Sequence, residues 1–101
     1  MSGLLIMYGG IVMRAVIAVI GKDMVGILAG VSNLCSQVNV NITEVTQSVM
    51  QDLFAMIMLV DISNCTIPFT ELSDQMEHLG TKMGLSVKIM HEDIFNSMHR
   101  V

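Results

Sequence analysis

Residues 14–38 read RAVIAVIGKDMVGILAGVSNLCSQV, and the apolar residues change their period on either side of a short polar turn. Arg14 to Ile20 is apolar at almost every position and rich in Val and Ile, which predicts a strand buried on both faces. After the turn, apolar residues recur at helical spacing, and these are Ile27, Leu28, Val31, Leu34, Cys35 and Val38. This second pattern predicts a helix of about three turns with one apolar face.

Two further strand patterns follow, separated only by Gln51 and Asp52. Val40 to Met50 alternates and is rich in Thr, Val and polar residues, whereas Leu53 to Ile62 is apolar at almost every position. So short a connection between two strand patterns predicts a β-hairpin, and we expect its second strand to be apolar on both faces.

A second helix and a last strand complete the pattern. Pro68 stands where the first turn of this helix is expected. The apolar residues of the helix follow at steps of three and four until Gly84, and they are Phe69, Leu72, Met76, Leu79 and Met83. SVKIMH, Ser86 to His91, predicts a short final strand. The predicted order is therefore β-α-β-β-α-β.

This order predicts an α+β fold of ferredoxin-like topology, a βαββαβ antiparallel sheet with two helices on one face. In that topology the first and third strands are central, and these are the two strands that are apolar on both faces. The other face of the sheet is left bare, so it needs a cover, either a second subunit or the C-terminal segment. For this reason we expect a homodimer.

The C-terminal segment has the pattern of a short helix. Glu92 and Asp93 stand at its expected N-terminus, where acidic side chains stabilise the helix dipole. Ile94, Phe95, Met98 and Val101 follow at helical spacing. We expect this helix to dock on an apolar surface of its own subunit or of a partner.

The chain has 101 residues, which suffices for one domain, and we assign residues 13–101 to it and residues 1–12 to an N-terminal extension. Glycines and Arg14 interrupt the apolar run before Ile20, and no basic leader precedes it, so membrane insertion is not expected. Cys35 and Cys65 form no C-x-x-C pair. This favours free thiols, buried or without a chemical role, in a reducing cytoplasm.

The charges argue against several classes of function. The net charge is −4, the five Lys and Arg residues are scattered, and there is no Trp, so direct nucleic-acid binding is not expected. The three histidines have no partners at metal-ligand spacing, and no Ser-His-Asp or Cys-His set is evident. We therefore predict no metal, no cofactor and no catalytic residue.

The turn between Gly21 and Gly26 has half of the pattern of a phosphate-binding loop. Ile27 and Leu28 stand where Lys and Ser or Thr would follow the second glycine, so the motif is incomplete. Two interpretations stay open. The backbone amides at the start of the helix bind a small anion, or the glycines only allow the chain to reverse.

The stretch VIGKDMVGILAGVSNLCSQVNVNITEV, residues 19–45, resembles the opening of an ACT domain. It combines a strand, an Asp-x-x-Gly turn, an apolar helix and an Asn-Ile pair that opens the next strand. The resemblance extends from Met13 to about His91. The closing IFNSMHRV is similar to small free-standing ACT proteins, which in turn resemble the glycine cleavage system transcriptional repressor. ACT domains are regulatory modules of ferredoxin-like fold that usually bind amino acids between two copies.

The resemblance implies a ligand-binding set for this chain. Asp23 matches the polar position of the turn and would accept the ligand ammonium, while amides near Gly26 and the side chain of Asn41 would donate to its carboxylate. Their neighbours complete the set, which is Asp23, Met24, Val25, Gly26, Ile27, Asn41 and Ile42. Val25 stands where many members have proline, and Gly21 where some ligand-binding members have histidine.

The sequence thus predicts a homodimeric, cytoplasmic regulatory module that binds a free amino acid and modulates a metabolic enzyme or regulator, without catalysis. The alternative is a structural or protein-interaction module that binds no ligand and docks on a partner protein through its sheet or helix face.

Overall fold

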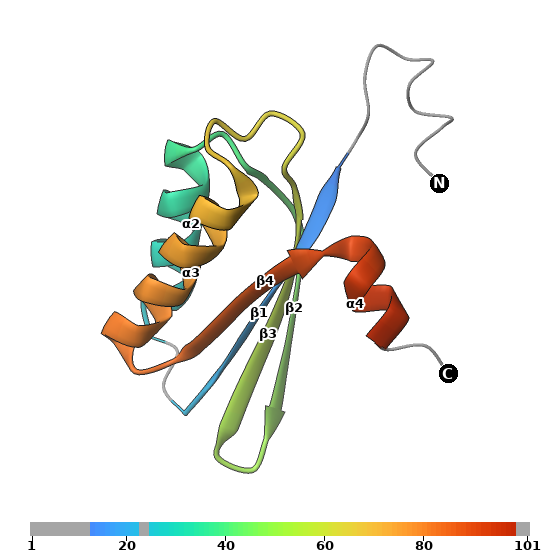
Figure 1. Ribbon diagram of the computed structural model, residues 1–101. Helices are drawn as coiled ribbons and strands as arrows, with labels where there is room; N and C mark the ends of the chain where they lie inside the picture. The colour runs from blue at the N-terminus through green and yellow to red at the C-terminus, as the bar shows by residue number, and fades with distance from the viewer. Residues whose placement is uncertain (1–12, 23–24, 99–101) are drawn as a thin grey trace.

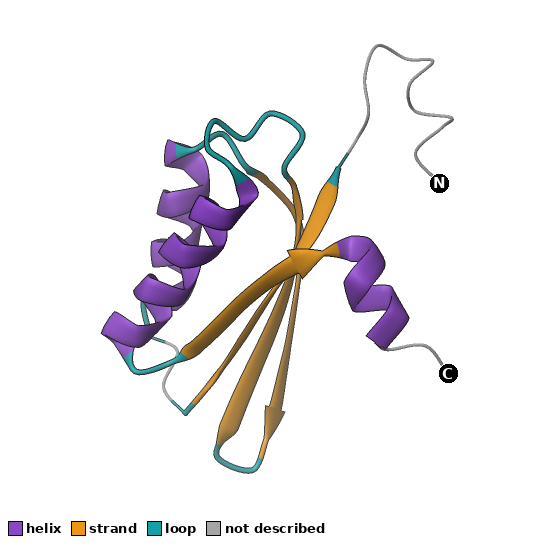
Figure 2. Ribbon diagram, in the orientation of Figure 1, coloured by secondary structure: helices purple, strands orange, loops and turns teal. Residues whose placement is uncertain are grey.

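The computed structural model describes residues 13–22 and 25–98, and its elements follow the predicted order (Figures 1 and 2). They are β1 (Arg14–Gly21), α2 (Ile27–Gln37), β2 (Asn41–Met50), β3 (Leu53–Asp61), α3 (Phe69–Met83), β4 (Ser86–His91) and α4 (Glu92–Met98). The predicted extension at residues 1–12 lies outside the described residues.

The four strands form one antiparallel sheet in the order β2-β3-β1-β4, which confirms the ferredoxin-like prediction. β1 and β3 are central, and Ile17 at the middle of β1 lies between Met58 of β3 and Ile89 of β4. The two strands that were predicted to be central, from their apolar residues on both faces, are thus the two that have a neighbouring strand on each side.

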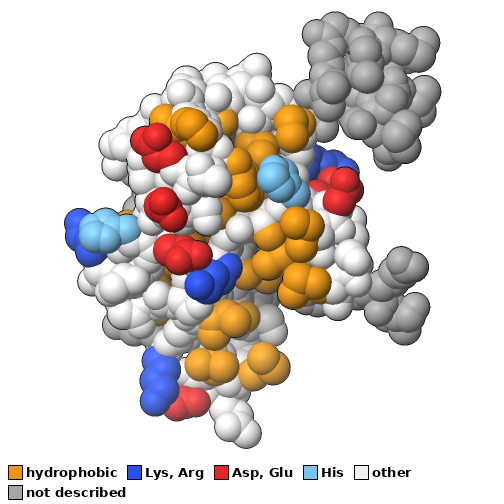
Figure 3. Space-filling model, viewed as in Figure 1, with side chains coloured by type: hydrophobic (Ala, Val, Ile, Leu, Met, Phe, Trp, Pro, Cys, Tyr) orange, Lys and Arg blue, Asp and Glu red, His pale blue; other side chains and the backbone are white. Residues whose placement is uncertain are grey.

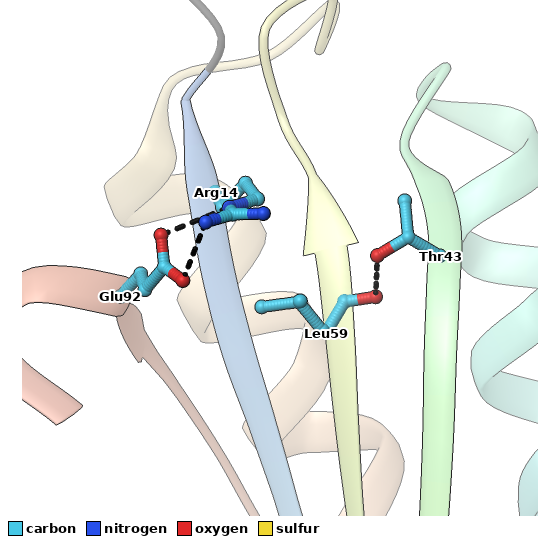
Figure 4. Close-up of polar contacts among 4 residues, drawn as sticks. All are labelled: Arg14, Thr43, Leu59 and Glu92. Atoms are coloured by element: carbon cyan, nitrogen blue, oxygen red, sulfur yellow. Dashed lines mark hydrogen bonds and ion pairs between the residues drawn. The ribbon is translucent and has the colours of Figure 1, made fainter. Parts of the chain in front are cut away.

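β2 carries an irregularity that keeps its pairing with β3. The register shifts between Ile42 and Glu44, and the hydroxyl of the intervening Thr43 donates a hydrogen bond of 2.9 Å to the carbonyl of Leu59 (Figure 4). Such a β-bulge places an extra residue on one strand. Beyond it, Val45, Gln47 and Val49 pair with Met58, Met56 and Phe54, so these β2 side chains share the helix-covered face.

The core lies between the sheet and the layer formed by α2 and α3. Ile17, Met58 and Leu72 are completely buried there. One detail of the helix prediction is wrong, because Leu28 is 42% exposed. Ile27, Val31 and Cys35 are spaced by four residues and form the centre of the contact, while Leu28 lies about 100° further round the helix.

The opposite face of the sheet is partly covered by α4, which confirms that the C-terminal segment forms a short docked helix (Figure 1). α4 packs against β1 and β4. Two nitrogens of Arg14 each lie 2.9 Å from a carboxylate oxygen of Glu92, a bidentate contact that fixes the start of α4 to the start of β1 (Figure 4).

Candidate functional site

The turn that leads into α2 is set by the backbone of Gly26. Gly26 has φ +82°, a left-handed conformation that glycine adopts without steric cost, and its carbonyl accepts the hydrogen bond of 2.9 Å from Gly30 that opens the helix. No described side chain caps this end of α2. Asp23 and Met24, two of the predicted ligand-binding residues, lie outside the described residues.

A hollow of about 370 Å³ lies beside this turn, on the helix-covered side of the hairpin end. It is lined by Lys22, Val25, Ile27, Leu28, Gln47, Phe54 and Met56. Of the predicted set, Val25 and Ile27 line the hollow, and Gly26 lies between them. The apolar lining with few polar groups is typical of a small-molecule site.

The two polar groups at the hollow are only weakly engaged within the chain. Lys22 Nζ lies 3.8 Å from the carboxylate of Asp52, and both side chains are more than three-quarters exposed, so this ion pair contributes little. Gln47 donates only to the sulfur of Met56, at 3.9 Å. A cation and an amide are therefore available to a ligand carboxylate.

Five lining residues were absent from the predicted ligand-binding set, namely Leu28 of α2 and, around the hairpin end, Lys22, Gln47, Phe54 and Met56. The hairpin register explains their place, because Gly21 pairs with Phe54, which pairs with Val49. The sequence signal that could have found them is the hairpin itself, since its closed end must lie beside the end of the first strand.

The last two predicted site residues, Asn41 and Ile42, lie at the other end of the sheet. Asn41 pairs with Asp61, which pairs with Arg14 at the start of β1, whereas the turn follows Gly21 at its end. Seven residue steps at about 3.3 Å separate the two ends by roughly 23 Å. Within one chain, Asn41 and Gly26 therefore cannot contact the same small ligand.

A larger hollow of about 620 Å³ lies in the groove between α2 and α3. Its residues include Gly30, Leu34 and Leu79, with Glu71 and His78 among the polar ones. No group of three or more His, Cys, Asp or Glu side chains within residues 13–22 and 25–98 could hold a metal ion. None of the helices described has both the length and the apolar composition needed to cross a bilayer.

Burial, together with a smaller effect of the nearby Cys65, raises the pKa of the Cys35 thiol from 9.0 to about 11. Both cysteines are free thiols. Cys35 lies on the buried face of α2 with 1% of its surface exposed, so its charged form is strongly disfavoured.

We expect this thiol to make stability depend on pH above about 9. The folded pKa is raised, so the contribution is complete below pH 9.0 and is lost as the pH rises toward about 11, since only the unfolded chain releases the proton in that window. Urea unfolding at pH 8 and pH 10 measures the decrease. Cys35→Ala should reduce the decrease, and an equal decrease in the variant would contradict this assignment.

Comparison with known proteins identifies the fold family. The sequence profile of the ACT domain matches residues 14–90. The chain belongs to the ACT domain family. It is 47% identical over 89 residues to a UPF0237 protein of Clostridium acetobutylicum, covering 88% of this chain and all of that one. A UPF0237 protein of Methanocaldococcus jannaschii is 48% identical, covering 87% and 98%.

Solved structures agree with this assignment. An ACT domain protein from Streptococcus pneumoniae superposes with a TM-score of 0.71 at 35% identity, covering 82% of this chain and 93% of that one. A protein named as a candidate glycine cleavage system transcriptional repressor superposes with a TM-score of 0.64 at 24% identity, covering 79% and 46%. The second likeness concerns the fold alone.

Proposed function

We propose that this ACT domain protein is a regulatory homodimer that binds a free amino acid between two copies and acts without catalysis. The observation that carries the proposal is the separation of Gly26 and Asn41. These two positions match one ligand-binding motif, yet they lie at opposite ends of the sheet in one chain. A second copy in antiparallel orientation brings them together.

The edge strand β2 offers a surface through which two copies of the chain can pair. An exposed edge has unpaired backbone groups that can hydrogen-bond to another strand. If two β2 strands pair antiparallel about a two-fold axis near Val45, Asn41 of a second copy lies beside Val49. Val49 pairs with Phe54, which lines the hollow beside the turn. The start of β2 of the second copy would then border the hollow, with Ile42 on the helix-covered face and Asn41, which pairs with Asp61, on the other face at the end of the strand.

The charge distribution supports this surface. The twenty residues from Met24 to Thr43 include no Asp, Glu, Lys, Arg or His, so α2 and the start of β2 carry no charged side chain. In a two-fold contact each residue near the axis meets its own copy, and like charges there would repel. α2 and residues 41–43 avoid that repulsion, whereas Glu44, next to Val45, is a charged residue of β2 that this axis places near its own copy.

The ligand chemistry follows from the lining of the hollow. Lys22 and Gln47 can bind a carboxylate, and the first amides of α2 point in the direction that favours a negative charge. Asp23 is proposed to accept the ammonium, as the family motif implies. We place the protein in the cytoplasm, where free thiols such as Cys35 and Cys65 stay reduced.

The first test is a thermal-shift screen against the twenty amino acids, read beside the molar mass. A ligand at a hundred times its dissociation constant adds about 2.7 kcal/mol, which moves the midpoint by several degrees. We expect Asn41→Ala to reduce this shift and to leave the fold of each chain unchanged, because Asn41 is exposed within one chain. Asn96→Ala, at an exposed position on α4, is the matched control.

Two outcomes would contradict the proposal. A selective shift of equal size in Asn41→Ala and the parent protein would remove Asn41 from the site. A stable dimer that responds to no amino acid would contradict ligand binding.

That second outcome would favour the alternative, a protein-interaction module. The observation behind it is the set of exposed apolar residues around the hairpin end, with Val25 84%, Val49 64% and Met50 60% exposed. A partner enzyme or regulator would cover such a surface.

A further inference from the structure

The larger hollow, of about 620 Å³, forms a groove between α2 and α3, here called the helix groove. Each helix lines it with one stripe of side chains, since the lining residues recur at steps of three and four. α2 contributes Gly30, Leu34 and two side-chain amides, and α3 contributes Glu71, Asp74, Leu79 and Lys82 among others. The buried stripes of the same helices face the sheet, so the helix groove faces away from it. It shares no lining residue with the hollow beside the turn.

The two helices run in opposite directions, and contacts at both ends fix their positions. Gly30, near the start of α2, lies beside Leu79 in the second half of α3. At the other end, the amide of Thr66 donates a hydrogen bond of 2.9 Å to the carbonyl of Val38, which ties the end of α2 to the segment before α3. The α3 residues that line the groove span 71–82, which is about three turns or roughly 16 Å.

The floor of the helix groove contains a glycine that the fold itself does not require. Glycine within a helix is less stable than alanine. Gly80 of α3 has a packing reason, because a Cβ atom there would lie 2.9 Å from the carbonyl oxygen of Leu85. Gly30 has no such reason, since a Cβ atom would make an ordinary contact of 3.5 Å with Leu79, and its φ lies outside the left-handed region. Its effect is to keep the floor of the groove deep.

The floor is apolar and the rim is polar. Leu34 and Leu79 lie on either side of the groove and are only partly buried against the core. The amides of Asn33 and Gln37 form part of the rim, and both side chains are exposed. An apolar centre with a polar rim is the usual anatomy of a protein interface. The occupant therefore needs a row of apolar side chains.

The walls of the groove determine the backbone conformation of the occupant. Backbone groups of α2 and α3 are paired within each helix, as in the hydrogen bonds from Gly30 to Gly26 and from Leu72 to Pro68. An extended segment would find no backbone partners there, unlike a segment that adds to a sheet edge. A helix satisfies its own backbone, and its ridge of side chains can pack between two other helices. The groove thus favours a helix.

The charges along the groove are arranged by sign. Residues 24–43 carry no charged side chain, so α2 contributes none. On α3, Glu71 and Asp74 lie at one end of the groove and Lys82 at the other. A complementary helix has basic residues beside the two carboxylates and an acidic residue beside the lysine.

These charges are available to a partner. Acidic side chains gather over α3 (Figure 3). Among them, Glu77 pairs with a lysine of β4 and lies outside the groove. Within residues 13–22 and 25–98, Asp74 and Lys82 form no ion pair. Glu71 accepts a hydrogen bond of 3.3 Å from Gln75, a neutral group that leaves its charge uncompensated.

We infer that the helix groove binds an amphipathic helix of a partner protein, with an apolar stripe, an acidic first turn and a basic last turn. Acidic residues in the first turn and basic residues in the last turn are also those that the helix dipole favours. The first turn of this helix lies at Lys82 and the last at Glu71 and Asp74, so it runs antiparallel to α3. This surface goes beyond the proposed function, because it uses neither the hollow beside the turn nor the edge of β2.

The test uses a labelled alanine-based helical peptide of about 16 residues, and its binding is measured by fluorescence anisotropy. The peptide has Leu at positions i, i+4 and i+7, Glu in its first turn and Arg in its last. In a second peptide the Glu and Arg residues are exchanged. We expect the first to bind and the second to bind about fivefold more weakly, as a few exposed ion pairs allow. Equal affinities, or no binding of the first peptide, would overturn the inference.

A charge variant of the protein controls for the different helicity of the two peptides. Asp74→Lys should weaken binding of the first peptide and strengthen binding of the second, since Asp74 lies on the rim of the groove. Asp93→Lys makes the same change at an exposed position on α4 and should leave both affinities as in the parent protein. If Asp74→Lys keeps the parent affinities, the orientation of the bound helix is wrong.

A second variant fills the floor. Gly30→Leu places a side chain in the groove and should weaken binding of the first peptide at least tenfold, which is about 1.4 kcal/mol. Ser36→Leu, at an exposed position of α2 outside the groove, is the matched control. Circular dichroism checks that both variants keep the fold. Parent affinity in a folded Gly30→Leu would contradict the inference.

The same variants separate this inference from the proposed function. None of the four substituted positions lines the hollow beside the turn, so each variant should keep the thermal shift that an amino acid produces. A protein that binds the first peptide but responds to no amino acid would contradict the proposed function alone. A protein that responds to an amino acid but binds neither peptide would contradict this inference alone.

Discussion

Replacing Gly80 by alanine is expected to lower the free energy of unfolding by about 2 kcal/mol, although alanine is ordinarily the better helix former. A Cβ atom at this position would lie 2.6 Å from Cγ2 of Val87 and 2.9 Å from the carbonyl oxygen of Leu85. The oxygen belongs to the backbone, and Leu85 also donates a hydrogen bond of 2.8 Å to Gly80. The oxygen cannot move without separating the end of α3 from the start of β4, and the Val87 methyl can move only by a change of rotamer in the core.

Gly30 provides the matched control in the other helix. A Cβ atom there would lie 3.5 Å from the nearest side-chain atom, Cδ1 of Leu79, which is an ordinary contact. Gly30→Ala should therefore stabilise the protein by about 0.5–1 kcal/mol through the lower entropy of the unfolded chain. Urea unfolding of both variants measures the difference, and a change of the same sign in the two would contradict this account.

The order of the strands in the sheet could be predicted from the sequence, because the spacing of apolar residues along each strand indicates whether one or both of its faces are buried. Residues 14–20 and 53–62 are apolar on both faces, which only central strands need. The close approach at Gly80 could not be predicted, since it depends on where α3 lies against β4. The exposure of Leu28 could not be predicted for a related reason. The spacing of apolar residues does not distinguish a core residue such as Ile27 from a neighbour that lines a surface hollow, as Leu28 does.

The candidate site was only partly accessible from the sequence. The glycine at the turn and the Asn-Ile pair are local patterns, so a motif could point to Gly26 and Asn41. Their distance from each other depends on the path of the chain through α2. This helix returns the chain to the end of the sheet where β1 begins, so Asn41 lies near Arg14 and far from Gly26. Lys22 and Phe54 meet only through the register of β1 with β3, and no local pattern records that register.

Replacing Leu72 by alanine is expected to lower the free energy of unfolding by about 3 kcal/mol. Leu72 lies on the sheet-facing side of α3, is completely buried and belongs to the main core cluster. Its truncation removes apolar contacts and leaves a cavity that surrounding side chains fill only in part. For a domain of this size, the thermal midpoint should fall by more than 10 °C, at about 4–8 °C per kcal/mol.

Leu28→Ala makes the same chemical change at a position that is 42% exposed, so we expect a loss of only about 1 kcal/mol. Equal losses in the two variants would contradict the assignment of the core to the space between helices and sheet. Leu72 does not line the hollow beside the turn, whereas Leu28 does. Since a ligand stabilises by an amount set by its concentration and dissociation constant, Leu72→Ala should keep the full ligand-induced increment. Leu28→Ala should lose part of it, which separates the role of a side chain in the fold from its role in the site.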